Sequence, residues 1–209
     1  MKFSIIIPAH NEGNKIQKAL ESIKSQSFTD YEVIVVCDAC EDNTKDIAKQ
    51  YNATVVEIDA HSSGIARNAG LNIAQGEWIL FCDADDWYLH EYVFEMLADK
   101  VGKENEDAVF FSLIWKNIGY GSVRSPLGTI YPHVANKCWK RSAIKDTRFP
   151  VVQYVVAEDA MFFENMMNKG IKIVEWDMPL YYYNWLNKGS KSQIIGRTPE
   201  STKAYWSNH

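Results

Sequence analysis

The sequence predicts an α/β fold in which a mostly parallel central sheet is flanked by helices. The first observation is that short apolar or β-branched runs alternate with segments of helical periodicity over the first half of the chain. The second is that the connections between them are short, as is typical where helices cover the faces of a parallel sheet. With 46% hydrophobic and 23% charged residues, the 209-residue chain has an ordinary globular composition and can bury a sizeable core.

The first three β-α units can be located from their apolar periodicity. An apolar run at residues 3–7 predicts the first strand, and Pro8 ends it because proline cannot donate to a sheet ladder. Apolar residues then recur at helical spacing through residues 16–23. The next two strand-helix pairs are expected at residues 31–37 with a helix through 47–51, and at residues 53–58 with a helix from 64 to 73.

The fourth strand carries the feature that points to chemistry. Its apolar run, Trp78–Cys82, ends abruptly in three carboxylates at Asp83, Asp85 and Asp86. In open α/β sheets, ligands bind at this carboxyl end of the strands. Three acids this close repel one another, so a cation among them explains the cluster better than a helix cap, which needs one Asp.

The pattern changes after a helix predicted from about residue 88 to 101 and a strand at residues 108–115. Glycines and prolines interrupt short β-prone pieces between residues 117 and 148, which suggests antiparallel ribbons. A helix after Glu158 and Asp159 and a strand at residues 171–176 follow. We therefore divide the chain into one domain with two halves and a polar tail, at residues 1–116, 117–195 and 196–209.

Composition and motif content exclude several classes of protein. A net charge of −5 argues against a general nucleic-acid binder, which needs a basic excess or a basic face. No glycine-rich G-x-G-x-x-G follows the first strand, where Pro8–Glu12 stands instead. This argues against a dehydrogenase and favours a nucleotide-binding fold that handles phosphate with a cation.

The N-terminal segment and the cysteines indicate in which cellular compartment the protein is expected. The N-terminal apolar run is too short for a signal peptide, and no later run approaches the ~20 apolar residues of a membrane span. Four cysteines in mostly apolar surroundings fit reduced thiols in a cytosolic protein. Cys37 and Cys40 have C-x-x-C spacing, but no second ligand pair supports a zinc site, and a redox pair is left open.

Six short motifs in order along the chain resemble those of the family 2 glycosyltransferases, which have the nucleotide-diphospho-sugar transferase fold known as GT-A. They are Ser4–Glu12, Val35–Asp38 with Asp42–Thr44, Gly64–Gly70, Phe81–Asp86, Glu158–Asp159, and Tyr181–Trp185 before Ser190–Ser192. A lone D-x-D is common, but six motifs in family order are hard to obtain by chance. By this resemblance, residues 1–116 are the nucleotide-sugar half and residues 117–195 the smaller, partly antiparallel acceptor side.

The resemblance, together with the expectation that Trp185 stacks on a sugar face, implies a substrate-binding set spread over both halves. It comprises Pro8, Ala9, Asn11, Glu12, Asp38, Arg67, Asp83, Asp85, Glu158 and Trp185. Asp38 would accept a hydrogen bond from uracil, although the chain departs from the family at Cys37, Ala39 and Cys40. A loop-capping Asx turn is the alternative for Asp38, and a surface helix arginine is the alternative for Arg67.

The resemblance also implies a metal site and a catalytic base. Asp85 and Asp86 are the candidate ligands of a Mn²⁺ or Mg²⁺ ion that neutralises the departing diphosphate. Asp159 is the candidate base for the acceptor hydroxyl, with Glu158 orienting it or contacting ligand. Two acids at a helix start are also ordinary capping chemistry.

We therefore expect an inverting, metal-assisted glycosyltransferase that uses a nucleotide-sugar donor, with UDP-sugar the expected kind, in cell-envelope or capsule glycan synthesis. Its expected partners are the donor and a glycan or lipid-linked acceptor, with no nucleic acid. A cytoplasmic location is expected, and contact with the inner face of the membrane is left open. The alternatives are a non-catalytic sugar-nucleotide or glycan-binding module and a nucleotidyltransferase, which would carry a glycine-rich basic loop after the first strand.

Overall fold

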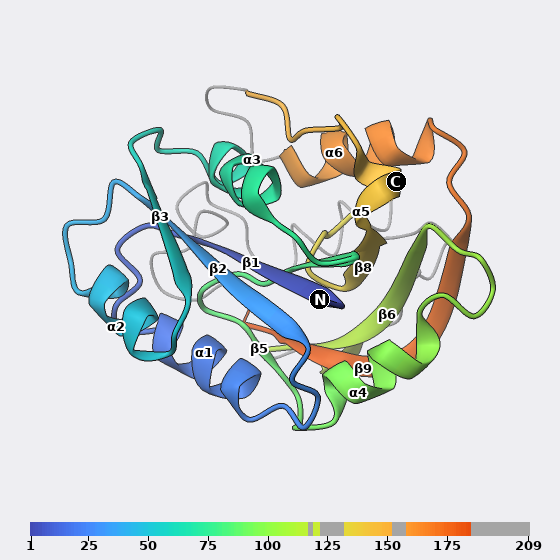
Figure 1. Ribbon diagram of the computed structural model, residues 1–209, viewed down its shortest axis with the longest axis horizontal. Helices are drawn as coiled ribbons and strands as arrows, with labels where there is room; N and C mark the ends of the chain where they lie inside the picture. The colour runs from blue at the N-terminus through green and yellow to red at the C-terminus, as the bar shows by residue number, and fades with distance from the viewer. Residues whose placement is uncertain (117–118, 122–131, 152–157, 185–209) are drawn as a thin grey trace.

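The protein folds around one mixed sheet with helices on both faces. The computed structural model describes residues 1–116, 119–121, 132–151 and 158–184. Its nine strands form a single sheet in the order β3-β2-β1-β4-β8-β6-β9-β5, with β7 paired to β6 (Figure 1). The predicted α/β class with a mostly parallel first part is therefore confirmed.

The first half of the sheet is parallel. β1 pairs in parallel with β2 and with β4, and β2 pairs in parallel with β3. The strand bounds are Phe3–Ala9 for β1, Tyr31–Asp38 for β2, Thr54–Ile58 for β3 and Trp78–Phe81 for β4. All four strands expected from the sequence are present, although β1 continues through Pro8 to Ala9 and does not end at the proline. Because the four strands run in the same direction, their carboxyl ends share one edge of the sheet.

The helices between these strands lie where periodicity predicted them. Their bounds are Ile16–Lys24 for α1, Thr44–Gln50 for α2 and Ser63–Ile73 for α3. In α1 the residues buried against the sheet are Ile16, Ala19, Leu20 and Ile23, the apolar stripe of its sequence. Ser62 caps α3 by accepting a hydrogen bond from the Ile65 N–H at 3.4 Å.

The second half mixes strand directions. β8 is antiparallel to β4 and β6, while β9 is parallel to β6 and antiparallel to β5. The strand bounds are Trp87–Tyr88 for β5, Ala108–Trp115 for β6, Gly119–Gly121 for β7, Lys137–Lys140 for β8 and Ile173–Tyr183 for β9. The helix bounds are Val93–Lys100 for α4, Arg141–Ile144 for α5 and Glu158–Met167 for α6.

Two boundaries in this half differ from the expectation. The helix predicted from about residue 88 begins at Val93, because residues 87–88 pair with β9 as a short strand. The predicted strand at 171–176 is longer, since it continues through the aromatic run to Tyr183 with a bulge opposite Ser112. The division at residue 116 stays a prediction, although the sheet runs across it, and the tail at 196–209 lies outside the described residues.

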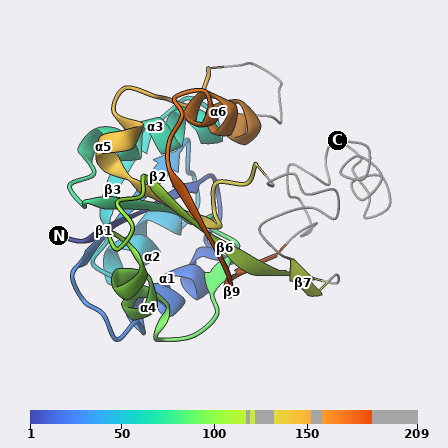
Figure 2. The same ribbon diagram turned by 90° about the vertical axis from the view of Figure 1, so that its right-hand side faces the viewer.

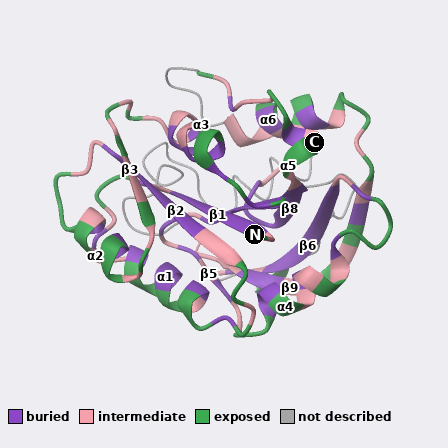
Figure 3. Ribbon diagram, viewed as in Figure 1, coloured by how far each residue is buried: buried purple, intermediate pink, exposed green. Residues whose placement is uncertain are grey.

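Two apolar cores lie on opposite faces of the sheet. One combines strand residues with α1, α2 and α4, and the other combines strand residues with α3, α5 and α6. Figure 2 shows the resulting three layers. Figure 3 shows that β1 and β6 are largely buried, whereas the edge strand β3 and the outer faces of the helices are exposed or partly exposed. Within the part of the chain that the structure describes, no helix is long and apolar enough to cross a membrane.

Candidate active site

Hydrogen bonds connect residues 83–86 after β4, here called the acidic loop, to the end of β9. The backbone N–H of Asp83 donates to the Tyr181 hydroxyl at 3.1 Å, and that hydroxyl donates to Asp86 Oδ2 at 2.8 Å. The backbone N–H of Asn184 donates to Asp86 Oδ1 at 2.7 Å. Asp86 therefore uses both carboxylate oxygens to join residues that are almost one hundred positions apart.

The three acids of this loop occupy different environments. Asp86 is only 1% exposed, and its burial, with the charges of Asp83 and Asp85, raises its pKa well above the usual range. Asp83 and Asp85 are partly exposed. The carboxylates that face solvent in this loop are therefore those of Asp83 and Asp85, while Asp86 anchors the loop from beneath.

A buried arginine connects the acidic loop to the start of α6. Arg67, on α3, is only 4% exposed. Its Nη2 lies 2.8 Å from Asp83 Oδ1 and its Nη1 lies 2.9 Å from Asp159 Oδ1. Nη1 also lies 3.8 Å from Glu158 Oε1. One guanidinium thus bridges three acids from two distant segments, and the surface alternative for Arg67 is wrong.

The guanidinium keeps its charge and one unused donor. Burial lowers the pKa of Arg67, but Asp159, Asp83 and Glu158 outweigh burial and raise it above its ordinary value. The ring of Phe149 lies 5.4 Å from the guanidinium carbon. Among the described residues, the buried Nε–H has no hydrogen-bond partner. A buried donor of this kind is costly unless a ligand or water completes it.

Asp159, at the N-terminus of α6, has the electrostatics of a proton acceptor. Burial raises its pKa to about 6, with Arg67 acting in the opposite direction and Asp83 and Glu158 adding to the increase. Its side chain is nevertheless 29% exposed, so a substrate can reach it. A carboxylate with a pKa near neutrality holds a proton more readily than an ordinary Asp.

Packing between α3 and α6 fixes this cluster. The Asn68 side chain donates to the Phe149 carbonyl and accepts from the Phe149 N–H, both at 2.9 Å. Phe149 stacks on Phe162 of α6 with ring centroids 4.1 Å apart. The Ser63 hydroxyl donates to Glu158 Oε1. These hydrogen bonds and ring contacts therefore hold α3 and α6 against each other and against the segment that contains Phe149.

The expected nucleotide-binding residues near β1 and β2 form a second cluster. The Asp38 carboxylate is buried and accepts backbone hydrogen bonds from Ala60, His61 and Ser62 at 2.7, 2.9 and 2.6 Å. Asp38 therefore fixes the loop before α3. This backbone capping is of the kind given above as the alternative to base recognition for Asp38. Contact with a base stays a prediction.

The loop after β1 is tied to the loop after β2. Asn11, at a positive φ of 53°, accepts from the Glu41 N–H at 2.8 Å through Oδ1. The Glu12 N–H donates to the Thr44 hydroxyl at 2.9 Å, and the Glu12 carboxylate pairs with Lys15 at 2.8 Å. Pro8 and Ala9 end β1 immediately before this loop. Trp185, also expected to bind substrate, lies outside the described residues.

Two residues whose pKa values respond to these acids were given no role of their own from the sequence. Burial, followed by the charges of Asp86, Asp83 and Asp159, raises the pKa of Tyr183. Lys137 of β8 is fully buried and donates to Asn136 Oδ1 at 2.8 Å. Burial lowers the pKa of Lys137 well below its usual value, with the charge of Asp159 acting in the opposite direction. A run of tyrosines does not by itself indicate nearby acids, and a lysine in a short strand gives no signal that it is buried.

The acidic loop has the chemistry of a hard-cation site, although it is not a complete cage. Within the described residues no three His, Cys, Asp or Glu side chains are grouped to hold a metal ion. Mg²⁺ and Mn²⁺ sites in phosphate chemistry need only one or two carboxylates, because substrate phosphates and water complete the shell. The partly exposed carboxylates of Asp83 and Asp85 fit that requirement.

Comparison with known proteins gives consistent similarities. The profile of Glycosyl transferase family 2 matches residues 4–171. The poly(ribitol-phosphate) beta-glucosyltransferase of Bacillus spizizenii is 31% identical over 226 residues, covering 96% of this chain. The poly(ribitol-phosphate) beta-N-acetylglucosaminyltransferase TarS of Staphylococcus aureus is 28% identical over 222 residues, again covering 96% of this chain. This chain spans 35% and 38% of the length of these two relatives.

Solved structures show the same architecture. Residues 1–349 of S. aureus TarS, crystallised with UDP, match with a TM-score of 0.77 at 26% identity, over 87% of this chain and 60% of that one. A mannosyltransferase from Pyrobaculum calidifontis, solved with GDP-Man and Mn²⁺, matches with a TM-score of 0.71 at 18% identity, over 99% and 68% of the two chains. At that identity the second match is a similarity of fold alone.

Proposed function

This chain belongs to glycosyl transferase family 2, and on that premise we propose that it transfers a sugar from a UDP-sugar to a hydroxyl group of a cell-envelope glycan or lipid-linked acceptor. The poly(ribitol-phosphate) glycosyltransferases that it resembles over 96% of its length support this class of acceptor. The UDP complex of TarS supports uridine as the base. A cytoplasmic location stays a prediction.

The observation that carries the proposal is the bridge made by Arg67 between Asp83 and Asp159. A donor diphosphate is dianionic or more, and a buried guanidinium with an unused Nε–H suits its oxygens. The same cation lies beside the carboxylate proposed to act on the acceptor. This arrangement supports a site in which the leaving group and the proposed base are held close to one cation.

The reaction follows from the proton affinity of Asp159. Its carboxylate accepts a hydrogen bond from the acceptor hydroxyl and takes the proton as the oxygen bonds to the anomeric carbon. The bond from that carbon to the diphosphate oxygen breaks on the opposite face, and the configuration inverts. Its pKa of about 6 leaves the group mostly ionised at neutral pH, while it still accepts a proton more readily than an ordinary Asp.

We propose Asp85 as the principal ligand of a divalent cation, with Asp83 beside it. When bound, Mn²⁺ or Mg²⁺ would neutralise charge on the departing diphosphate. Asp86, predicted as a ligand from the sequence, is instead proposed to hold the loop in place, because Tyr181 and Asn184 already occupy its two oxygens. The fold neighbour solved with Mn²⁺ supports a divalent ion in this class of fold.

Two alternatives make different predictions. A non-catalytic sugar-nucleotide or glycan-binding module has no need of an acid with a pKa near 6 beside a buried arginine. A nucleotidyltransferase needs a glycine-rich basic loop after β1, where this chain has Pro8–Glu12. The glycosyltransferase proposal is favoured on both points.

Replacement of Asp159 by Asn tests the proposal. UDP release from a panel of UDP-sugars is measured with and without candidate polyol-phosphate acceptors, and UDP affinity is measured by calorimetry. We expect transfer to fall by at least about a hundredfold while UDP affinity changes little. Glu164→Gln is the matched control, because Glu164 is exposed on the same helix. Transfer that survives in Asp159→Asn would refute the base assignment.

A further inference from the structure

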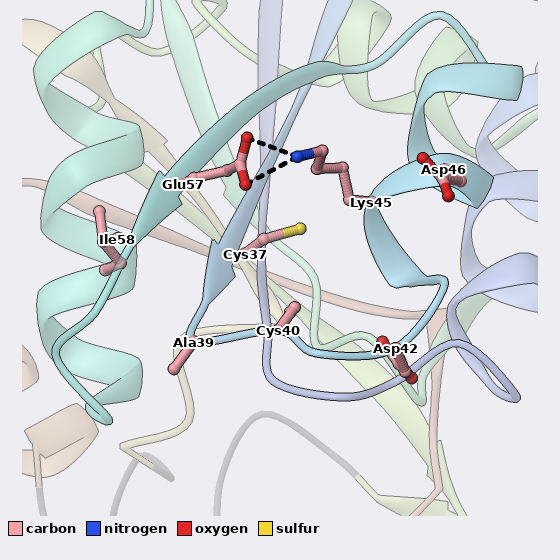
Figure 4. A pocket seen from close by; sticks show the side chains of 8 residues that line it. All are labelled: Cys37, Ala39, Cys40, Asp42, Lys45, Asp46, Glu57 and Ile58. Carbon is pink, nitrogen blue, oxygen red and sulfur yellow. Dashed lines mark hydrogen bonds and ion pairs between the residues drawn. The ribbon is translucent and has the colours of Figure 1, made fainter.

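The C-x-x-C motif has a structural setting that the proposed reaction does not use. Cys37 and Cys40 line a pocket of about 330 Å³ beside the end of β2. Figure 4 shows their side chains on the pocket wall next to Lys45 and Glu57, which form an ion pair at 2.8 Å. Both thiols are free in this structure, with Cys37 buried and Cys40 partly exposed.

The two cysteines lie at one short turn. They are three positions apart in the chain, and both line the wall of the same pocket. Ala39, between them in the chain, has a positive φ of 50°, so the backbone turns back sharply after β2. Two cysteines at the two ends of such a turn are close enough along the chain for a disulfide to form with a local movement of the turn.

The same turn is connected to the loop after β1. The Cys40 thiol donates to the Ala9 carbonyl at 3.4 Å. Asn11 Oδ1 accepts from the Glu41 N–H at 2.8 Å, and the Gly13 N–H donates to the Asp42 carboxylate at 2.8 Å. A change in the position of Cys40 is therefore transmitted to the loop that the proposed function assigns to the nucleotide.

We propose that Cys37 and Cys40 form a reversible disulfide that weakens nucleotide binding at the neighbouring loop. The bond formation is testable on its own, whereas its effect on binding rests on the proposed function. Bond formation moves the Cys40 sulfur away from the Ala9 carbonyl and towards Cys37, which shifts the turn at residues 39–42. Reduction restores the contact.

The oxidant is a small neutral disulfide. The ionised Cys40 thiol attacks one of its sulfurs, forming a mixed disulfide and releasing one small thiolate, which takes up the Cys40 proton. The Cys37 thiol then loses its proton and attacks the Cys40 sulfur, releasing the second thiolate, which takes up that proton. Two protein thiols are oxidised and one small disulfide is reduced to two thiols.

The order of the two attacks follows from exposure and charge. Burial, with the nearby Cys40 and Glu57, raises the pKa of Cys37 to about 12, so the partly exposed Cys40 reacts first. Asp42, Asp46 and Glu57 outnumber Lys45 on the pocket wall, so a neutral oxidant is favoured over an anionic one. The second step is expected to be slow at neutral pH and faster at higher pH.

The experiment uses the full chain equilibrated in buffers of hydroxyethyl disulfide and mercaptoethanol. Peptide mass spectrometry measures the Cys37–Cys40 bond, and calorimetry measures UDP affinity in the reduced and oxidised forms. We expect one intramolecular bond and UDP affinity about tenfold weaker in the oxidised form. By reciprocity, saturating UDP should make the bond about tenfold harder to form.

Matched variants separate the possible outcomes. Cys37→Ala and Cys40→Ser should bind UDP with an affinity that no longer depends on the buffer, whereas Cys138→Ser, at a buried cysteine of β8, should keep the response. Absence of the intramolecular bond would overturn the proposal. A bond that leaves UDP affinity unchanged would overturn the coupling. If the reduced protein bound no nucleotide, the proposed function and the coupling would both be refuted. Peptide mass spectrometry would still show whether the Cys37–Cys40 disulfide forms.

Discussion

The cluster around Arg67 and the cluster around Asp38 use charge in opposite ways. In the first, a side-chain cation on α3 joins side-chain acids from the loop after β4 and from α6. In the second, one carboxylate accepts hydrogen bonds from three backbone N–H groups of the loop before α3. Both Arg67 and Asp38 are buried, but only the first cluster leaves partly exposed acids.

The difference separates groups that can exchange partners from groups that fix shape. A ligand phosphate or cation can compete for ion pairs between side chains, because acids and guanidinium keep their charges when the pairing changes. Backbone donors have no alternative partner without unfolding the loop. The Arg67 cluster is therefore suited to chemistry and the Asp38 cluster to holding the binding surface in shape.

Replacing Arg67 by Met should have the largest effect on stability. It leaves Asp83, Asp159 and Glu158 close together without their shared cation, a loss of about 3–5 kcal/mol. Urea unfolding measures it, with Arg148→Met, at an exposed contact to Asn72, as the control. A loss below about 1 kcal/mol would show that the cluster is not held by this charge.

Replacing Asp38 by Asn should cost less but still be clearly measurable. The neutral amide keeps one oxygen and turns an N–H₂ group towards the backbone donors, so we expect a loss of about 2 kcal/mol. Asp59→Asn, at an exposed side chain nearby, is the control. Unfolding by urea gives the difference, and an unchanged midpoint would contradict the view of Asp38 as a backbone anchor.

Tyr181→Phe should have a smaller effect on stability, because it weakens only the attachment of the acidic loop. It removes the hydroxyl that donates to Asp86 and accepts from the Asp83 N–H, for a loss of about 1–2 kcal/mol. If this loop holds the cation, the apparent affinity for Mn²⁺ in the presence of UDP should also weaken. Tyr92→Phe, at an exposed tyrosine, serves as the control for both measurements.

The smallest expected effect is the pH dependence of transfer. Asp159 accepts a proton only when ionised, and burial raises its pKa to about 6. The rate at low substrate should therefore rise with pH up to about 6 and level off above about 7, with a loss of about tenfold at pH 5. A profile that is flat between pH 5 and 7 would argue against Asp159 as the base.

The sequence predicted the parallel strands and their helices well because local periodicity is enough to define them. The buried residues of α1 are the four apolar residues that recur at helical spacing. By contrast, β5 has two residues and exists only through its pairing with β9. No pattern within residues 87–88 could indicate that partner, so that segment was predicted as the start of a helix.

The candidate site was predicted as a set of residues, but not as a set of contacts. Asp83 and Asp159 were chosen from motifs, and the structure adds that both bind Arg67. Asp86 was expected to face a metal, yet a tyrosine 95 positions later binds its Oδ2. Roles that depend on such distant partners cannot be read from local spacing, because the same acidic triplet permits either orientation.

We expect the bonds that hold the acidic loop to be completed late in folding. The parallel strands β1 to β4 can associate before the last third of the chain is available, but Asp86 and the Asp83 N–H find their partners only when β9 has docked. Contacts of such sequence separation form late and slowly. The first three β-α units can therefore be assembled while the acidic loop still lacks its partners, and a chain that stops short of Tyr181 would carry the acids without the strand that orders them.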